Sequence, residues 1–126
     1  MTSSPRHFDT FAVGQQASTG RHFDHDNVSE WSQMAGLDQP WPQVPEPLIA
    51  GLFSYLLGEQ LPGHGTNYLK QNMHFAAAAH IGEHLTATVS ITRLRADKSL
   101  VYLDTLCTGE DGRVICSGDA LVLFQH

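Results

Sequence analysis

The sequence predicts an α+β fold in which an antiparallel β-sheet is wrapped around one long apolar helix. Two observations lead to this prediction. Residues 48–57 are apolar on almost every side of a helix, as expected where other elements cover it all round. From residue 66 onward, runs of alternating apolar and polar residues indicate half-buried strands. A helix and a sheet of this kind bury their apolar surfaces against each other.

Length and charge limit the classes of function. The 126 residues suffice for one domain with its own core, and the 41% hydrophobic content is typical of globular proteins. A net charge of −6 without any basic run argues against nucleic acid or an anionic membrane as partner. We expect residues 1–7 to form a flexible polar tail and residues 8–126 to form a single domain.

The N-terminal third contains a strand and a short helix. Residues 17–23 are expected to form the first strand. The segment Asp24–Asn27 offers good N-cap residues, and apolar residues then recur at three-residue spacing. A short amphipathic helix from about Asp26 to Gly36 is predicted, with the glycine as its C-terminal stop.

Prolines separate this helix from the long apolar one. Pro40, Pro42 and Pro45 exclude regular structure in residues 37–46, so this segment is expected to be a stiff loop. The long helix should begin near Pro47, because proline is well accommodated in a first helical turn.

Four strands are expected after the long helix, in a meander. Because such a sheet has open edges, one of them is expected to pair with a second copy of the chain. A hairpin turn at residues 110–112 should join the last two strands. The predicted strands are Thr66–Phe75, Leu85–Leu94, Ser99–Cys107 and Arg113–Phe124.

Several segments, in their order and spacing, are together similar to the MaoC-like (R)-specific enoyl-CoA hydratases. The resemblance implies a hotdog fold and a homodimer. It further implies an acyl thioester of coenzyme A or of a carrier protein as the substrate, threaded along the central helix, without further cofactor or metal. The segments are Phe11–Gly14, Arg21–Phe23, Pro47–Leu52, Leu61–Thr66 and Gly118–Leu123.

The family reaction requires hydrogen-bond donors for the thioester oxygen and a proton-transfer pair. The resemblance places the N–H groups of Ala50 and Gly51 at the start of the central helix as donors, because helix N-termini favour developing negative charge. A plain alternative is that Gly51 only permits close packing within a buried helix.

The family's Asp-x-Asn-Pro-x-His motif is altered in this chain. An ungapped alignment puts Leu37 at the aspartate and Pro42 at the histidine. Sliding the alignment by one residue brings Asp38 and Gln43 to those positions. Asp38 is then the predicted base, with its pKa raised by burial under Trp41, and Gln43 can only orient a water. An exposed loop aspartate is the alternative interpretation of Asp38.

Other residues could complete this site. His74, on a predicted strand, and His64, in the turn after the helix, are candidates for the missing acid and for the pocket wall, although strand histidines usually serve in packing. Trp41 is expected to contact the substrate. Glu46 can act as a base or simply interact with the helix dipole.

Two charged patterns receive a weaker functional interpretation. The segment His80–His84 matches an H-x-x-E-H zinc motif, which requires a helix, whereas a turn and a strand are predicted here. Arg93, Arg95 and Lys98 gather at one expected hairpin, where they could bind coenzyme A phosphates or be solvated.

The sequence therefore predicts a cytoplasmic acyl-CoA hydratase or dehydratase that acts on the α,β bond. The N-terminus has no apolar signal segment, and we expect two reduced cysteines. Two alternatives stay open: a non-catalytic subunit that binds acyl thioesters, and an acyl-CoA thioesterase.

Overall fold

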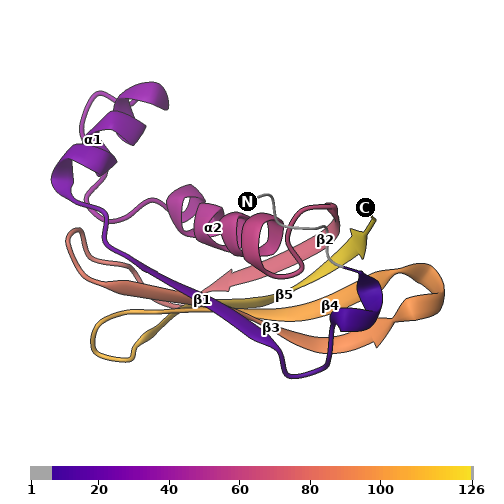
Figure 1. Ribbon diagram of the computed structural model, residues 1–126. Coiled ribbons are helices and arrows are strands. Elements are labelled where there is room, and N and C mark those ends of the chain that lie inside the picture. Colours follow the sequence, from indigo (N-terminus) through magenta and orange to yellow (C-terminus); the bar gives the residue numbers. More distant parts are fainter. Residues whose placement is uncertain (1–6, 126) are drawn as a thin grey trace, which may run out of the picture.

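The computed structural model describes residues 7–125. A five-stranded antiparallel sheet has the order β1-β3-β4-β5-β2, and one helix, α2, lies across one face of it (Figure 1). This confirms the predicted α+β fold of a sheet around an apolar helix. The predicted four-strand meander is wrong for its first strand, because β2 pairs with β5 at the edge of the sheet and not with β3. Of the predicted tail, only His7 lies within the described residues. The helices are α1 (His25–Met34) and α2 (Glu46–Tyr55), and the strands are β1 (Gln16–Arg21), β2 (Thr66–Phe75), β3 (Leu85–Arg95), β4 (Leu100–Thr108) and β5 (Val114–Phe124).

Helix α2 fills the centre of the core. Its side chains of Ile49 and Phe53 are at most 1% exposed, and it continues as a π-helical turn, Leu56–Gln60, which buries two more leucines. The central strands of the sheet each bury one face against the helix. On β3, every second residue from Leu85 to Ile91 is buried. The alternation in the sequence therefore predicted the inward face correctly. Among residues 7–125, no helix is both long and apolar enough to cross a membrane.

Helix α1 projects from the body of the molecule near one end of the sheet (Figure 1). Asp24 and Asn27 form a reciprocal capping box, in which each side chain accepts the other's backbone N–H. The buried Ser32 hydroxyl donates to the carbonyl of Val28 and accepts the N–H of Trp41 at 3.0 Å. The proline-rich loop is thereby fastened to α1.

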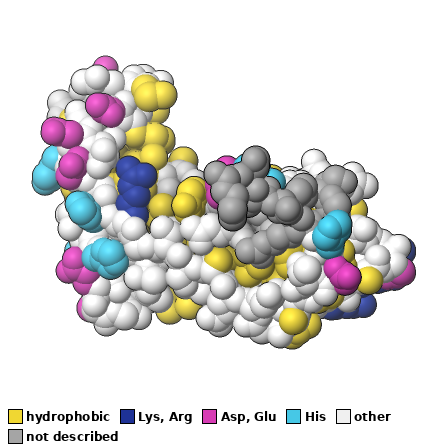
Figure 2. All heavy atoms as spheres, in the orientation of Figure 1, with side chains coloured by type: hydrophobic (Ala, Val, Ile, Leu, Met, Phe, Trp, Pro, Cys, Tyr) yellow, Lys and Arg dark blue, Asp and Glu magenta, His cyan; other side chains and the backbone are white. Residues whose placement is uncertain are grey.

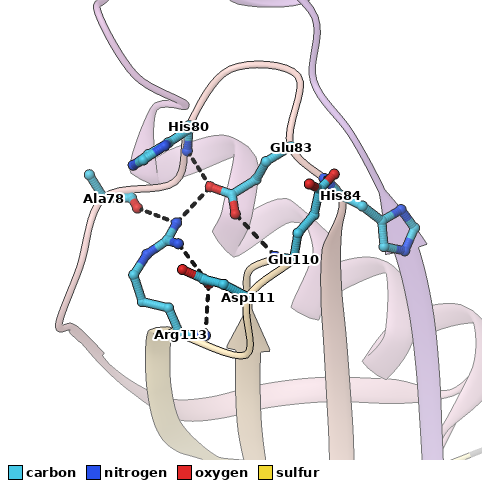
Figure 3. Close-up of polar contacts among 7 residues, drawn as sticks. All are labelled: Ala78, His80, Glu83, His84, Glu110, Asp111 and Arg113. Carbon is cyan, nitrogen blue, oxygen red and sulfur yellow. Dashed lines mark hydrogen bonds and ion pairs between the residues drawn. The ribbon is translucent and has the colours of Figure 1, made fainter.

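A network around Glu83 joins the β2–β3 loop to the β4–β5 hairpin (Figure 3). The Glu83 carboxylate, 10% exposed, lies 2.6 Å from the Arg113 guanidinium and accepts the backbone N–H groups of His80 and Glu110. Arg113 also donates to the carbonyl of Ala78 and pairs with Asp111. Glu83 on one loop and Arg113 on the other therefore neutralise each other, and these contacts fix the two loops relative to each other.

The same contacts determine the ionisation of Glu83. Burial alone would raise the pKa of this carboxyl, but the hydrogen bonds from His80, Arg113 and Glu110 outweigh burial, so its pKa lies below the usual value. A lowered folded-state pKa contributes stability above the unfolded-state pKa, and this contribution is lost as the pH falls through the folded-state value.

We therefore expect the free energy of unfolding to decrease as the pH falls below about 5, the region in which unfolded glutamates protonate. Glu83→Gln should lower the free energy of unfolding at pH 7 by about 2 kcal/mol, because it removes a charged partner of Arg113. Urea titrations of both proteins between pH 3 and 7 test this. The variant should lose less stability toward acid, and equal pH dependence in the two proteins would contradict the assignment.

Candidate functional site

A cavity of about 560 Å³ lies between α1, α2 and β1. Figure 2 shows this region as a hollow beside the projecting helix, with apolar side chains along the inner side of the helix. Helix α1 contributes one face to the cavity wall, made of residues spaced three and four apart: Asn27, Glu30, Trp31 and Met34.

Helix α2 forms the opposite wall with a similar face. Leu48, Leu52 and Tyr55 line it, and Gly51 lies between them. A Cβ atom built on Gly51 would meet nothing within 4 Å, so the missing side chain leaves open space in the cavity wall. The cavity is therefore apolar on this side, with open space at the glycine.

Strand β1 completes the cavity with polar groups. Thr19 and Arg21 border it, and the Arg21 guanidinium carbon lies 4.6 Å from the centroid of the Phe23 ring. Among residues 7–125, no carboxylate pairs with Arg21, and Glu30, which also borders the cavity, forms neither an ion pair nor a side-chain hydrogen bond. Two opposite charges thus border one cavity without neutralising each other.

Of the residues predicted for the site, Gly51 borders this cavity. Helix α2 begins at Glu46, so the N–H groups of Gly51 and Ala50 lie beyond the four that a helix leaves free. In a regular helix these amides bond the carbonyls four residues earlier. Their position offers no support for the predicted oxyanion role, which stays a prediction.

The loop residues are outside the described lining of the cavity. Asp38 is exposed, Gln43 is half-buried, and Trp41 is 42% exposed. Asp38 is therefore not buried under Trp41, in contrast to the prediction. The end of this loop is instead held to the β2–β3 loop, where Val44 donates its N–H to the carbonyl of Ala79.

The two histidines also lie elsewhere. His74 is paired with Ser117, and its neighbour Phe75 packs into the core. Because strand side chains alternate, His74 points away from α2 on the outer face of the sheet. His64 is 80% exposed and pairs with Glu59 at 3.1 Å. The structure does not bring the predicted residues together.

The basic residues of the predicted hairpin lie outside the described lining of the cavity, and the segment His80–His84 does not form the helix that a zinc motif requires. Arg95 pairs with Asp97, and Arg93 lies over the Tyr102 ring, at the end of the sheet opposite α1 in Figure 1. The segment His80–His84 is a turn that leads into β3, as predicted, and not a helix. Within residues 7–125, no three His, Cys, Asp or Glu side chains are grouped as metal ligands.

Sequence reasoning missed Glu30, Arg21 and Tyr55. The three-residue spacing that predicts α1 also places Glu30 one turn after Asn27, so the shared face could be read from the sequence. Which element lies opposite this face depends on how α1 packs beside α2, and helical periodicity does not specify this packing.

No protein-family model matches the chain. The chain is 42% identical to an (R)-specific enoyl-CoA hydratase from Aeromonas caviae over 124 residues, which span 87% of this chain and 92% of the relative. It is 36% identical to a 3-hydroxybutyryl-CoA dehydratase from Methylorubrum extorquens, over 58% of this chain and 46% of the relative. Among solved structures, an (R)-hydratase from A. caviae involved in PHA biosynthesis superimposes with a TM-score of 0.84 and 32% identity, over 92% of this chain and 98% of that chain.

The open wall at Gly51 leads to a prediction about stability. Gly51→Ala should raise the free energy of unfolding by about 0.5–1 kcal/mol, because alanine is favoured in helices and its methyl meets no atom. Gly118→Ala is the contrasting variant. It should lower the free energy of unfolding, because a Cβ at this position collides with the backbone of Asn72. Urea denaturation of the two variants measures both effects, and a destabilised Gly51 variant would show that the cavity wall is not open.

Proposed function

The chain belongs to the MaoC-like (R)-specific enoyl-CoA hydratase family, and we propose that it adds water to trans-2-enoyl-CoA thioesters and catalyses the reverse dehydration. The similarity to the Aeromonas caviae hydratase over nearly the full length of both chains carries this proposal. The thioester is the substrate, and addition of water requires no redox cofactor.

The cavity supports an acyl substrate. Its walls are formed largely by apolar side chains such as Trp31, Leu48 and Leu52, and sites for small molecules are typically apolar clefts of a few hundred Å³ with few polar groups. Gly51 widens this cavity midway along α2. A short enoyl chain fits such an environment, with its polar thioester toward the charged groups.

A non-catalytic subunit that binds acyl thioesters is the second candidate. The observation in its favour is the altered motif, with Leu37 and Pro42 where the family has its aspartate and histidine, together with the exposed position of Asp38. Such a subunit would be stabilised by an acyl-CoA without converting it.

The test mixes the purified protein with a short trans-2-enoyl-CoA and follows enoyl absorbance and free thiol in one sample. We expect loss of the enoyl signal without thiol release. The protein's own Cys107 and Cys116 are buried, and burial raises the pKa of Cys107 to about 11, so they contribute little thiol signal. Thiol release would identify a thioesterase, and ligand-induced stabilisation without turnover would identify the binding subunit.

A variant at the cavity sharpens this experiment. Gly51→Ala places a methyl group in the space assigned to the acyl chain, and we expect a KM several-fold higher with an intact fold. Gly58→Ala, in the π-helical turn outside the described lining, is the matched control, because its Cβ only reaches ordinary contact with Tyr68. An unchanged KM in the Gly51 variant would place the acyl chain elsewhere.

We also propose a homodimer formed through β2, in the cytoplasm. Strand β2 is a ten-residue edge strand with exposed Tyr68, Leu69 and Met73, whereas the other edge, β1, has six residues. Long apolar edges are suited to pairing with another chain. The two free thiols fit a reducing compartment.

Sedimentation velocity tests the assembly. The unchanged chain should sediment as a dimer, and Leu69→Lys should shift it toward the monomer, because the charge must be buried beside the partner strand. Leu106→Lys is the control, since Leu106 is similarly exposed but lies on the central strand β4. A monomer before substitution, or an equal effect of both substitutions, would rule out the β2 interface.

A further inference from the structure

We infer that Glu30 is the catalytic carboxylate of the proposed hydration and that Arg21, which borders the same cavity, stabilises the negative charge that develops on the substrate. This inference rests on the proposed function. It assigns the proton transfer to α1 and β1 and not to the loop that carries Asp38.

Elimination among the described groups that line the cavity leads to Glu30. The titratable side chains there are Arg21, Glu30 and Tyr55. A guanidinium keeps its protons and a phenol holds its proton at neutral pH, so neither accepts a proton from water. The carboxylate of Glu30 is the remaining group that can do so.

The two charged groups are available to a ligand. Neither the Glu30 carboxylate nor the Arg21 guanidinium forms an ion pair among residues 7–125, although they border the same cavity. The Phe23 ring packs against the guanidinium and leaves its donors unused. The Glu83 carboxylate, by contrast, is fully engaged by Arg113 and two backbone N–H groups.

The fold presents Glu30 on a supported helix. The capping box of Asp24 and Asn27 begins α1 one turn earlier, and buried Val28 and Ser32 anchor the helix on both sides of Glu30. Glu30 itself is exposed, so water reaches the carboxylate, and Gly51 opposite leaves room for an acyl group. A catalytic group requires this combination of a fixed backbone and an accessible side chain.

The chemistry balances with these two residues and water. Glu30 accepts a proton from water as the water oxygen bonds to C3 of the enoyl thioester. The electron pair of the C2–C3 double bond moves toward C2 and the thioester oxygen, where Arg21 offsets the charge. The carboxylic acid then returns the proton to C2, and one water has been added with Glu30 restored.

Enzyme assays with the full chain and a short trans-2-enoyl-CoA test the inference. Glu30→Gln should lower kcat/KM by about 100-fold or more, as for loss of a general base, and Glu30→Asp should retain part of the activity. Glutamine is a good helix former, so the melting temperature should change little. Arg21→Gln should lower kcat more than it raises KM, because its charge is needed mainly as negative charge develops.

Two aspartate variants complete the set. Asp26→Asn, exposed on α1 and outside the described lining, is the control and should stay within about twofold of the unchanged chain. Asp38→Asn tests the rival base.

The outcomes separate the two proposals. If the unchanged chain is active and Glu30→Gln keeps its rate, the role of Glu30 is overturned while the hydratase function stands. Loss of activity in Asp38→Asn alone would assign the base to the loop. If the unchanged chain converts no enoyl-CoA, the hydratase function is wrong and the role of Glu30 fails with it.

Discussion

The burial of α2 against the concave face of the sheet is the interaction on which the rest of the structure depends. Phe53, Leu56 and Leu57 have no exposed surface, and they occupy the space that the inward side chains of the central strands leave. Burying each such side chain contributes roughly 1.5–3 kcal/mol. Because α2 is held on its sheet-facing side, its opposite side, with Leu48, Gly51 and Tyr55, becomes a fixed cavity wall.

The second wall buries fewer side chains. Helix α1 is anchored in the core by Val28 and is further stabilised by local interactions, namely its capping box and the hydrogen bonds of Ser32 to Val28 and Trp41. The site thus combines a rigid element from the core with a helix that is preorganised by its own sequence. This arrangement allows polar residues to change on α1 with little effect on the core.

The sequence predicted the fold well because the fold follows from periodicity. Alternation between Leu85 and Ile91 specifies which face of β3 is inward, and the prolines and Gly36 mark where helices cannot continue. Which residues lie together around the cavity could not be predicted, because this depends on contacts between elements distant in sequence. His74 illustrates the difference: its strand was predicted correctly, but its register with Ser117 puts it on the outer face. Gly51, which the family resemblance singled out, borders the cavity, and its oxyanion role stays a prediction.

The pairing of Cys107 with Cys116 across β4 and β5 has a consequence for how local opening of the molecule can be observed. Both thiols lie close to the hairpin that joins the two strands, without exposed surface, and burial raises the pKa of each. A labelling reagent therefore reaches them only when this end of the strand pair opens. Their labelling rate reports the population of molecules in which β4 and β5 have come apart beside the hairpin, as amide hydrogen exchange does for backbone groups. The chain contains, in this pair, an internal reporter of local opening in its sheet.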